Sequence, residues 1–473
     1  MMKKLILFLV AVMLFISQPL RSQETVSQDK IAGSWMGKIQ AGGISLRVVF
    51  NFTITDKDSI AVTFASPDQG SKNIIIGPVI INGKEINVKA PLLLAEYKGI
   101  FKNDTLIEGT WYQAGRSAPL NISKLRQAFS LNRPQEPKAP FPYISEDVTF
   151  MNETAGIELA GTLTIPEGDG PFPAVVLVTG SGSQNRNEEL MGHKPFLVIA
   201  DHLTRNGIAV LRYDDRGVGL SKGSPLNCTT ADFATDAAAA VSYLRKRKEI
   251  DPGYVGIAGH SEGGLIAPMV ASQNPETAFI ISLAGTGVKG EIIMHTQNYE
   301  IGLASGMDPE VLSKGVATNK KLFAVLKKEN DDAIAAEKIR TVYRKLLEKE
   351  KKSPEEIDKL VSDLSNSLNP ASYPWLRYFI ITDPAQFWKK VKCPVLALNG
   401  DRDLQVSATV NLPAIEKALR AGGNKEVTVK LMPGLNHLFQ HCKTGLPTEY
   451  GEIEETFSVE VLDIMTGWIR DLR

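Results

Sequence analysis

Hydrophobic and polar side chains alternate along short segments in the first quarter of the chain. Residues Ser45–Ile54 and Leu106–Trp111 show this period of two, which predicts β-strands with one buried face. No helical pattern of convincing length interrupts them. We therefore expect residues 23–126 to form a small antiparallel sheet or barrel, with Trp35 and Trp111 filling its core rather than binding a ligand.

A proline-rich stretch follows this β-rich region. Residues Arg133–Pro142 contain four prolines in ten positions, a composition that favours an extended, semi-rigid connector. Residues 127–144 are therefore interpreted as a linker, and residues 145–473 as a second domain.

Beyond the linker, apolar runs alternate with segments of helical periodicity. Continuous apolar runs are typical of strands covered on both faces, and their alternation with helices predicts a mostly parallel sheet flanked by helices. The expected strands are Val148–Met151, Leu159–Ile165, Ala174–Thr179, Ile208–Tyr213, Tyr254–Ala258, Phe279–Ala284, Val395–Asn399 and Val427–Leu431. The expected helices include Pro195–Arg205, Ala231–Arg247, Glu262–Gln273, Asn411–Ala421 and Phe457–Leu472.

A long insertion, about residues 289–390, interrupts this alternation with helical patterns alone. Within it, Ser353–Glu356 supplies a hydroxyl cap, a proline at the first helical position and a glutamate three residues after the serine. Because loops at this edge of a sheet usually carry function, we interpret the insertion as a lid over the strand ends. The alternative is a solvated helical decoration without a catalytic role.

The composition is that of a globular protein. Hydrophobic residues make up 43% and charged residues 22% of the 473 residues, which is enough apolar surface for a large core. The 53 basic residues balance the 53 acidic ones, and the chain has no basic stripe. We therefore expect no nucleic-acid partner.

The first residues predict an export signal. Lys3 and Lys4 precede the apolar run Leu5–Ile16, which ends before small and polar residues around Ser22. The run is shorter than the roughly 20 residues that span a bilayer, so export with cleavage is favoured over anchoring. Residues 1–22 are expected to be removed, leaving a periplasmic or secreted protein with no stable membrane insertion.

The three cysteines suggest neither a disulfide framework nor a metal site. Cys228, Cys393 and Cys442 are too few and too scattered for such a framework, although an exported protein could form one bridge. No spacing of cysteine and histidine is typical of zinc. We expect no metal and no organic cofactor.

The most informative motif is Gly259–Gly263, with the sequence GHSEG. The apolar run Tyr254–Ala258 precedes it and a helical pattern follows. A serine on such a strand-to-helix turn sits in a strained backbone that exposes its hydroxyl at the sheet edge, and the flanking glycines let strand and helix approach closely. Ser261 is therefore a candidate nucleophile.

Candidates for an acid and a base follow Ser261 in the chain. A serine hydroxyl needs a base to take its proton, and a histidine base needs a carboxylate to hold its tautomer. Asp401 and Asp403 follow the expected strand Val395–Asn399, and His437 lies in a loop after the next strand. Each could by itself be an ordinary loop residue. Their order, serine then acid then histidine, favours a triad over coincidence.

Together these motifs resemble those of the α/β-hydrolase superfamily. The resemblance rests on Gly259–Gly263, Gly400–Asp403 and the loop Asn436-His437, and it covers about residues 145–473. It implies an α/β-hydrolase fold, in which helices flank a mostly parallel sheet with a helical lid insertion, preceded here by the small antiparallel all-β domain.

The same resemblance assigns catalytic roles. It implies that Ser261 is the nucleophile and His437 the base. The acid is then Asp403, which matches a Gly-x-x-Asp pattern that begins at Gly400, and Asp401 is the alternative acid.

An oxyanion hole is implied at the turn after the strand Ala174–Thr179. Many superfamily members have His-Gly there, where this chain has Thr179-Gly180, a tolerable change because the hole uses backbone N–H groups. The implied donors are the N–H groups of Ser181 and Glu262. The stretch Gly180–Asn187 further resembles exported bacterial carboxylesterases that carry an N-terminal β module.

Nearby charged residues are interpreted as structural. Asp214 and Asp215 follow a strand and are expected to pair with Arg212 or Arg216 to hold the turn. His260 is expected to lie beside the serine turn, and the sequence identifies no acid partner for it.

Our hypothesis is an exported serine hydrolase that cleaves small-molecule carboxylic esters through an acyl-enzyme. One alternative is a serine peptidase, because the same triad opens amides. Another is a surface protein whose β module binds glycan and whose hydrolase domain is only a scaffold. The sequence leaves the natural substrate, the role of the β module and the oligomeric state open.

Overall fold

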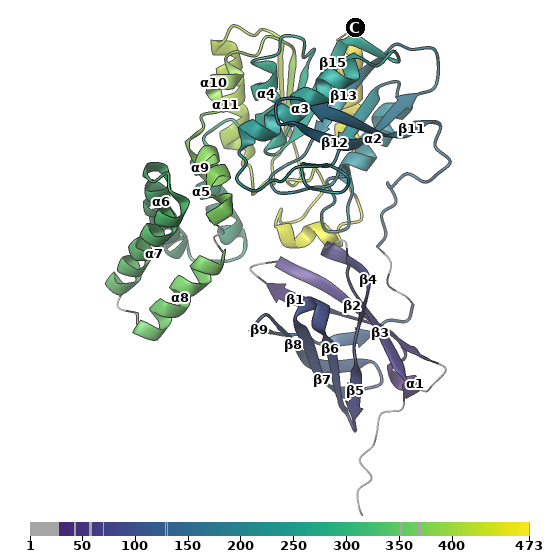
Figure 1. The fold of residues 1–473 in the computed structure, drawn as a ribbon, viewed down its shortest axis with the longest axis vertical. Coiled ribbons are helices and arrows are strands. Elements are labelled where there is room, and N and C mark those ends of the chain that lie inside the picture. Colours follow the sequence, from purple (N-terminus) through teal and green to yellow (C-terminus); the bar gives the residue numbers. More distant parts are fainter. Residues whose placement is uncertain are drawn as a thin grey trace, which may run out of the picture. The chain divides into compact units, whose positions relative to one another are not determined.

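The computed structural model describes residues 28–472, apart from 42–43, 56–58, 70, 128, 130, 351 and 368–369. The described residues divide into two compact units, one within residues 1–67 and 71–130 and the other within residues 68–70 and 131–473 (Figure 1). The expected signal peptide, residues 1–22, lies outside the described residues.

The smaller unit is an antiparallel sheet, as predicted. Its strand order is β4-β3-β2-β1-β10-β8-β7-β6-β5, and β9 pairs with β8. Along the chain a short helix α1 (Gln28–Ile31) precedes β1 (Gly33–Ala41), β2 (Ile44–Ile54), β3 (Ile60–Ser66), β4 (Ser71–Ile76), β5 (Val79–Asn82), β6 (Glu85–Ala90), β7 (Ala95–Asn103), β8 (Leu106–Gln113), β9 (Arg116–Pro119) and β10 (Ile122–Lys124).

Aromatic side chains fill the core of this unit. Trp35 is fully buried, and its indole N–H donates to the carbonyl of Ile31 at 2.7 Å. Trp111 stacks on Phe64 with ring centroids 5.2 Å apart. The prediction that both tryptophans are core residues is confirmed, because a buried indole must pack on other rings and satisfy its N–H within the protein.

The larger unit is built on one mixed sheet of eight strands in the order β11-β12-β14-β13-β15-β16-β17-β18. The strands β11 and β12 pair antiparallel, β12 joins β14 antiparallel, and the remaining neighbours are parallel. Their bounds are β11 (Tyr143–Asn152), β12 (Ile157–Pro166), β13 (Phe172–Val178), β14 (Ala209–Tyr213), β15 (Ile250–His260), β16 (Ile280–Leu283), β17 (Val395–Gly400) and β18 (Val427–Met432). All eight expected strands are present, within a few residues of their predicted ends.

Helices cover both faces of this sheet, so its central strands are apolar on each side. One face is covered by α3, α4, α10 and α11, and the other by α2 and α12 (Figure 1). These helices are α2 (Pro195–Arg205), α3 (Thr230–Arg245), α4 (Gly263–Ala271), α10 (Ala385–Trp388), α11 (Ala408–Ala421) and α12 (Val459–Asp471). The predicted fold class is confirmed.

The predicted helical insertion lies between β16 and β17. It contains α5 (Gly290–Ala304), α6 (Pro309–Lys328), α7 (Asp332–Lys349), α8 (Pro354–Ser367) and α9 (Tyr373–Ile381), and it ends with α10. The helices α6, α7 and α9 share an apolar core of their own, around Leu326, Ile339 and Ile380. The insertion is therefore a packed layer rather than a set of separate solvated helices.

The proline-rich segment is tied to the larger unit. The guanidinium of Arg133 donates to the carbonyls of Gly192 and Gly451, at 3.1 and 2.9 Å. The Gln135 amide donates to the carbonyl of Phe457 at 2.6 Å. Although the segment has no regular secondary structure, these bonds hold it in place, so it is more than a spacer.

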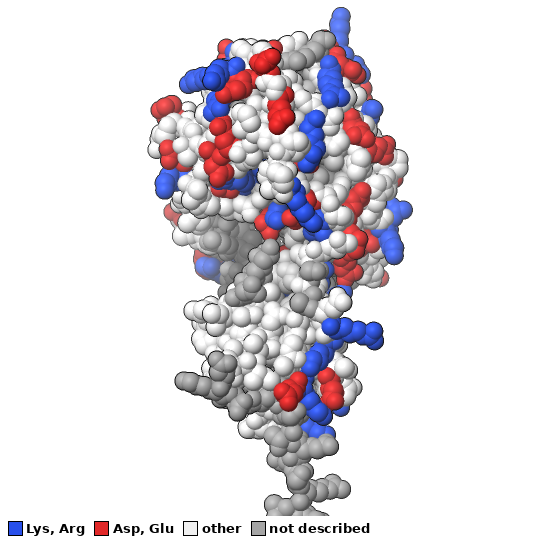
Figure 2. All heavy atoms as spheres, turned by 90° about the vertical axis from the view of Figure 1, so that its right-hand side faces the viewer, with Lys and Arg blue, Asp and Glu red and all other residues white. Residues whose placement is uncertain are grey.

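Charges of opposite sign are interspersed on the surface of the larger unit, on the face that Figure 2 shows. Arg344 lies 2.7 Å from Asp358, and Arg420 lies 2.8 Å from Glu416. Exposed pairs of this kind contribute about 1 kcal/mol or less each. Apolar burial between the helices and the sheet is therefore the larger source of stability.

Replacing Trp35 with alanine should destabilise the smaller unit strongly. The change removes a fully buried indole and leaves a cavity, at a cost of about 3–5 kcal/mol in the free energy of unfolding. Urea denaturation followed by circular dichroism measures this cost. Tyr112→Ala is the matched control, because Tyr112 is 42% exposed and its loss should cost only about 0.5 kcal/mol. Equal stability of the two variants would contradict the role assigned to Trp35.

Candidate active site

The loops that carry the predicted site residues meet at one edge of the larger sheet. The strands β13, β14, β15, β17 and β18 run parallel, so their carboxyl ends lie at the same edge. In open α/β sheets this edge is where ligands bind. Residues separated by more than 170 positions in the sequence are thereby brought together.

Ser261 occupies the sharp turn between β15 and α4. Its φ is +54°, in the left-handed region that non-glycine residues rarely adopt. The turn is possible because two flanking positions lack side chains: a Cβ at Gly259 would lie 2.0 Å from the carbonyl oxygen of Gly263, and one at Gly263 would lie 2.1 Å from that of Val178. The expected strand–turn–helix context of the motif is therefore present.

Asp403 and His437 form a buried pair beside this turn. Nδ1 of His437 lies 2.8 Å from Oδ2 of Asp403, and the other carboxylate oxygen accepts the N–H groups of Gln405 and Val406 at 2.8 Å each. Because the carboxylate oxygen accepts a hydrogen bond from Nδ1, that nitrogen carries the ring proton. The lone pair of Nε2 is then free to act as a base. Asp403 and His437 are 3% and 6% exposed.

Asp401 serves a different purpose. Its Oδ1 accepts the N–H of Gly434 at 2.7 Å, which ties the loop after β17 to the loop that carries His437. The carboxylate that meets the imidazole is therefore that of Asp403, the choice made from the Gly-x-x-Asp pattern, and Asp401 holds the two loops together.

Ser261 and His437 line the same cavity, of about 310 Å³. Gly180 and Ser181 form one side of it, and Ile293, Met294, Trp375 and Phe379 of the helical insertion form another. In the described part of the chain no hydrogen bond joins the Ser261 hydroxyl to the imidazole. Bonds between a catalytic serine and its base often tighten only when substrate binds.

Ser181 and Glu262 line this cavity, and their backbone N–H groups have no protein acceptor among the described residues. The neighbouring N–H of Gly180 instead donates to Oε1 of Glu188 at 2.8 Å. A Cβ at Gly180 would lie 3.1 Å from Cβ of Ser261, so this turn lies directly against the serine. The two predicted donors are thus available to an oxygen bound beside Ser261.

A second carboxylate–histidine pair lies behind the first, and the sequence did not reveal it. Nδ1 of His260 lies 2.9 Å from Oε1 of Glu188, and its Nε2 lies 2.9 Å from the carbonyl oxygen of His437. The expectation that His260 lies beside the turn is right, but it does have an acid partner. No local motif links Glu188 to His260, because 72 residues separate them.

The surroundings of His260 indicate that its imidazole is positively charged. Both ring nitrogens face oxygen acceptors, and a nitrogen can bond to such an oxygen only by donating a proton. Burial disfavours the charge, but the Glu188 carboxylate outweighs it and raises the pKa of His260 above its ordinary 6.5. The rings of His260 and His437 are 4.7 Å apart. The imidazole of His260 therefore packs directly against the candidate base and holds its backbone carbonyl.

The acidic residues after β14 have other partners than those predicted. Asp214 pairs with Arg186 at 2.7 Å, and Asp215 accepts the Thr179 hydroxyl and the Gln184 N–H, each at 2.8 Å. The predicted pairing with Arg212 or Arg216 is wrong. The donors come instead from Arg186 and from the turn that contains Thr179 and Gln184, which only the folded chain brings next to these carboxylates.

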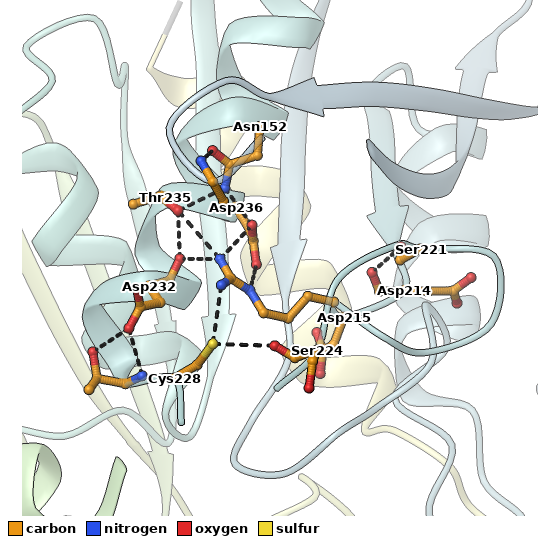
Figure 3. A network of polar contacts seen from close by, with 12 residues as sticks. Asn152, Asp214, Asp215, Ser221, Ser224, Cys228, Asp232, Thr235 and Asp236 are labelled. Atoms are coloured by element: carbon orange, nitrogen blue, oxygen red, sulfur yellow. Dashed lines mark hydrogen bonds and ion pairs between the residues drawn. The ribbon is translucent and has the colours of Figure 1, made fainter. Parts of the chain in front are cut away.

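Arg216 instead pairs with a helix. Its guanidinium lies 2.8 Å from Asp236 of α3, and Asn152 donates to the same carboxylate at 2.6 Å. Figure 3 shows Asn152, Thr235 and Asp236 converging in this network. The loop after β14 is thus anchored to α3 rather than held by a local ion pair.

Chemically, the site can support nucleophilic acyl transfer. It combines a strained serine, an oriented imidazole and two N–H donors around one cavity. Among the described residues, no three or more His, Cys, Asp or Glu side chains gather as they would around a metal ion. No described helix is long and apolar enough to cross a membrane.

Comparison with known proteins agrees with this chemistry. The model of the hydrolase family described as serine aminopeptidase, S33, matches residues 194–441. Esterase EstD of Thermotoga maritima is 29% identical over 319 residues, which cover 66% of this chain and 65% of the esterase. The chain thus spans just under two thirds of that relative's length. The thiohydrolase AneE of Aspergillus aculeatus is 33% identical over 138 residues, which cover 29% of this chain and 40% of the thiohydrolase.

Among solved structures, an esterase of Pyrococcus furiosus is similar, with a TM-score of 0.41 and 16% sequence identity. The alignment covers 72% of this chain and 97% of that esterase.

The charge on His260 can be tested by nitrogen NMR of the labelled histidine rings. Because the pKa of His260 is raised above its ordinary 6.5, we expect most His260 rings to carry protons on both nitrogens at pH 6.5. Glu188→Gln should lower the pKa of His260, because the amide removes the negative charge while burial remains. The His260→Gln variant identifies the signals. A neutral His260 ring in the unmodified protein at that pH would contradict the assignment.

Proposed function

We propose that this chain, which belongs to the serine aminopeptidase S33 family of hydrolases, cleaves carboxylic esters through Ser261, His437 and Asp403. We also propose that the enzyme is exported. The observation that carries this proposal is that His437, whose Nδ1 is held by the buried Asp403, lines the same cavity as the strained Ser261. The serine and the imidazole, which come from separate loops, thus lie where one bound ester carbonyl could reach both, while Asp403 acts only through His437.

The proposed reaction has two halves. His437 takes the proton of the Ser261 hydroxyl as its oxygen attacks the ester carbonyl, and the N–H groups of Ser181 and Glu262 bind the resulting oxyanion. His437 then gives the proton to the departing alcohol, leaving an acyl-enzyme. Water activated by His437 attacks that intermediate and releases the acid. In each half His437 first accepts a proton at Nε2 and then gives it up, while Asp403 holds Nδ1.

Esters are preferred over peptides as substrates in this proposal. The relative matched over the longest stretch of sequence is named an esterase, whereas the family description names an aminopeptidase. A serine peptidase is therefore the second candidate, since the same groups open amides. Rates measured side by side on p-nitrophenyl esters and aminoacyl anilides discriminate between an esterase and a peptidase. A clear preference for anilides would make the peptidase the first candidate.

Replacing the serine should remove nearly all ester turnover. We expect Ser261→Ala to lower kcat on p-nitrophenyl butanoate by about ten-thousand-fold, with an unchanged circular dichroism spectrum. Asp403→Asn should lower it about a thousandfold or more, because the amide favours the wrong imidazole tautomer.

The matched control for the acid is Asp401→Asn. The amide oxygen can still accept the Gly434 N–H, so the rate should stay within about threefold of the original. Substantial turnover by Ser261→Ala, or a larger loss from Asp401→Asn than from Asp403→Asn, would overturn the assignment of roles.

Export is the remaining part of the proposal, and it rests on the charged start and short apolar run of residues 1–22. We expect the protein purified from its native cells to begin near residue 23. N-terminal sequencing measures this. Recovery of a chain that retains Leu5–Ile16 in the membrane fraction would point to an anchor instead.

A further inference from the structure

A second cavity, of about 460 Å³, adjoins the one that contains Ser261. Its walls come from the turn after β13, the end of β14, the helices α3 and α4, and the helical insertion around Trp375. Neither Ser261 nor His437 lines it. The larger unit therefore offers two adjoining spaces, and only one of them contains the candidate nucleophile and base.

The two cavities meet at a partition. Gly180, Ser181, Glu262 and Trp375 line both of them. The indole N–H of Trp375 donates to Oε1 of Glu262 at 2.8 Å, and its ring stacks on Phe379 with centroids 5.4 Å apart. The side chain is thus held from two sides, by a hydrogen bond and by a ring contact.

The carboxylate that holds Trp375 is itself well fixed. Glu262 is 3% exposed and also accepts the hydroxyl of Thr230 at 2.6 Å. Since Glu262 directly follows Ser261, the partition is attached to the turn that carries the nucleophile. Movement of the indole would therefore be opposed by its ring contact with Phe379 and by its hydrogen bond to Glu262, which Thr230 of α3 also holds.

The chemistry of ester cleavage assigns the two halves of a substrate to the two cavities. When the Ser261 oxygen bonds to the carbonyl carbon, the bond to the alcohol oxygen breaks, and that oxygen takes its proton from His437. The alcohol must therefore leave within reach of His437, in the first cavity. The acyl group, on the other side of the carbonyl carbon, points away from the imidazole and toward the partition.

The lining of the second cavity suits an apolar acyl group. Tyr213, Phe233 and Ile266 contribute rings and aliphatic carbon to it. Its two other acidic side chains are matched by protein donors: Asp236 pairs with Arg216, and Asp215 accepts two hydrogen bonds. What remains for a ligand to contact is mainly apolar surface, which binds hydrocarbon chains.

We propose that the second cavity is the acyl pocket and that the Trp375 indole is the partition that limits how far an acyl chain extends into it. This inference rests on the proposed function. Short acyl groups fit beside Ser261 without disturbing the indole, whereas longer ones collide with it. Trp375 is in this view a residue that determines specificity, and it takes no part in proton transfer.

The test is an acyl-chain series of p-nitrophenyl esters, from acetate through butanoate and octanoate to decanoate. We expect Trp375→Ala to raise the ratio of kcat/KM for octanoate over butanoate by about tenfold or more, because the two cavities become continuous. Both kcat/KM values are measured on the same protein sample. A fraction of unfolded variant therefore lowers both values equally and leaves their ratio unchanged. Adding Phe233→Trp to this variant should reverse the gain by refilling the second cavity.

Two further variants separate bulk from hydrogen bonding. Trp375→Phe keeps an aromatic ring but loses the N–H, so its chain-length ratio should stay near that of the original protein. Ile381→Ala, on the same helix but 48% exposed, is the matched control and should change nothing. A gain in Trp375→Phe equal to that in Trp375→Ala would show that the hydrogen bond, and not the ring, forms the partition.

A second series varies the alcohol of butanoate esters, with release of acid followed by pH-stat. We expect Trp375→Ala to leave the alcohol preference unchanged. Altered alcohol preference with unaltered acyl preference would overturn the assignment of the cavities. An unchanged profile in both series would overturn the partition while leaving the esterase activity intact. Absence of ester turnover in the original protein would instead contradict the proposed function.

Discussion

One carboxylate oxygen joins the loops on which the candidate site depends. Oε1 of Glu188 accepts the N–H of Gly180 and bonds to His260, and His260 in turn bonds to the carbonyl oxygen of His437. The turn after β13, the end of the strand before Ser261 and the histidine loop are thereby fixed to one another. Since Glu188 is 3% exposed, water does not compete for these bonds. Removing this carboxylate would leave a buried cation unpaired and two N–H groups unsatisfied, so its effect would spread to every loop of the site.

The histidine loop is supported from its other side by the proline-rich segment. Gln440, three residues after His437, donates to the carbonyl of Glu455 at 2.9 Å. The stretch that contains Glu455 is bonded to Gln135, whose side chain accepts the Thr456 N–H at 2.6 Å. A segment whose composition suggests a simple connector therefore belongs to the framework of the larger unit. Its prolines reduce the entropy lost when it is fixed there.

The helical insertion has two physical roles in this arrangement. Its helices α6, α7 and α8 pack on one another and on α9 through apolar clusters, so the insertion can keep its shape while it covers the strand ends. Its inner helices α5 and α9 supply the walls of the first cavity, and α9 also brings Trp375 to Glu262. Contact between the insertion and the serine turn couples the shape of the cavities to the position of the residue next to Ser261.

The sequence alone determined the elements and the order of the candidate site. Period-two alternation and apolar runs are local properties, so the two units, the eight strands of the larger sheet and the helical insertion could be predicted from them. The choice of Asp403 over Asp401 came from motif spacing, and the structure brings that carboxylate to His437. Only the tertiary structure decided the partners that join distant segments: Glu188 with His260, Arg216 with Asp236, and Trp375 with Glu262. Such contacts depend on how strands and helices assemble in space, and because 20 to 113 residues separate the partners, no local pattern could have predicted them.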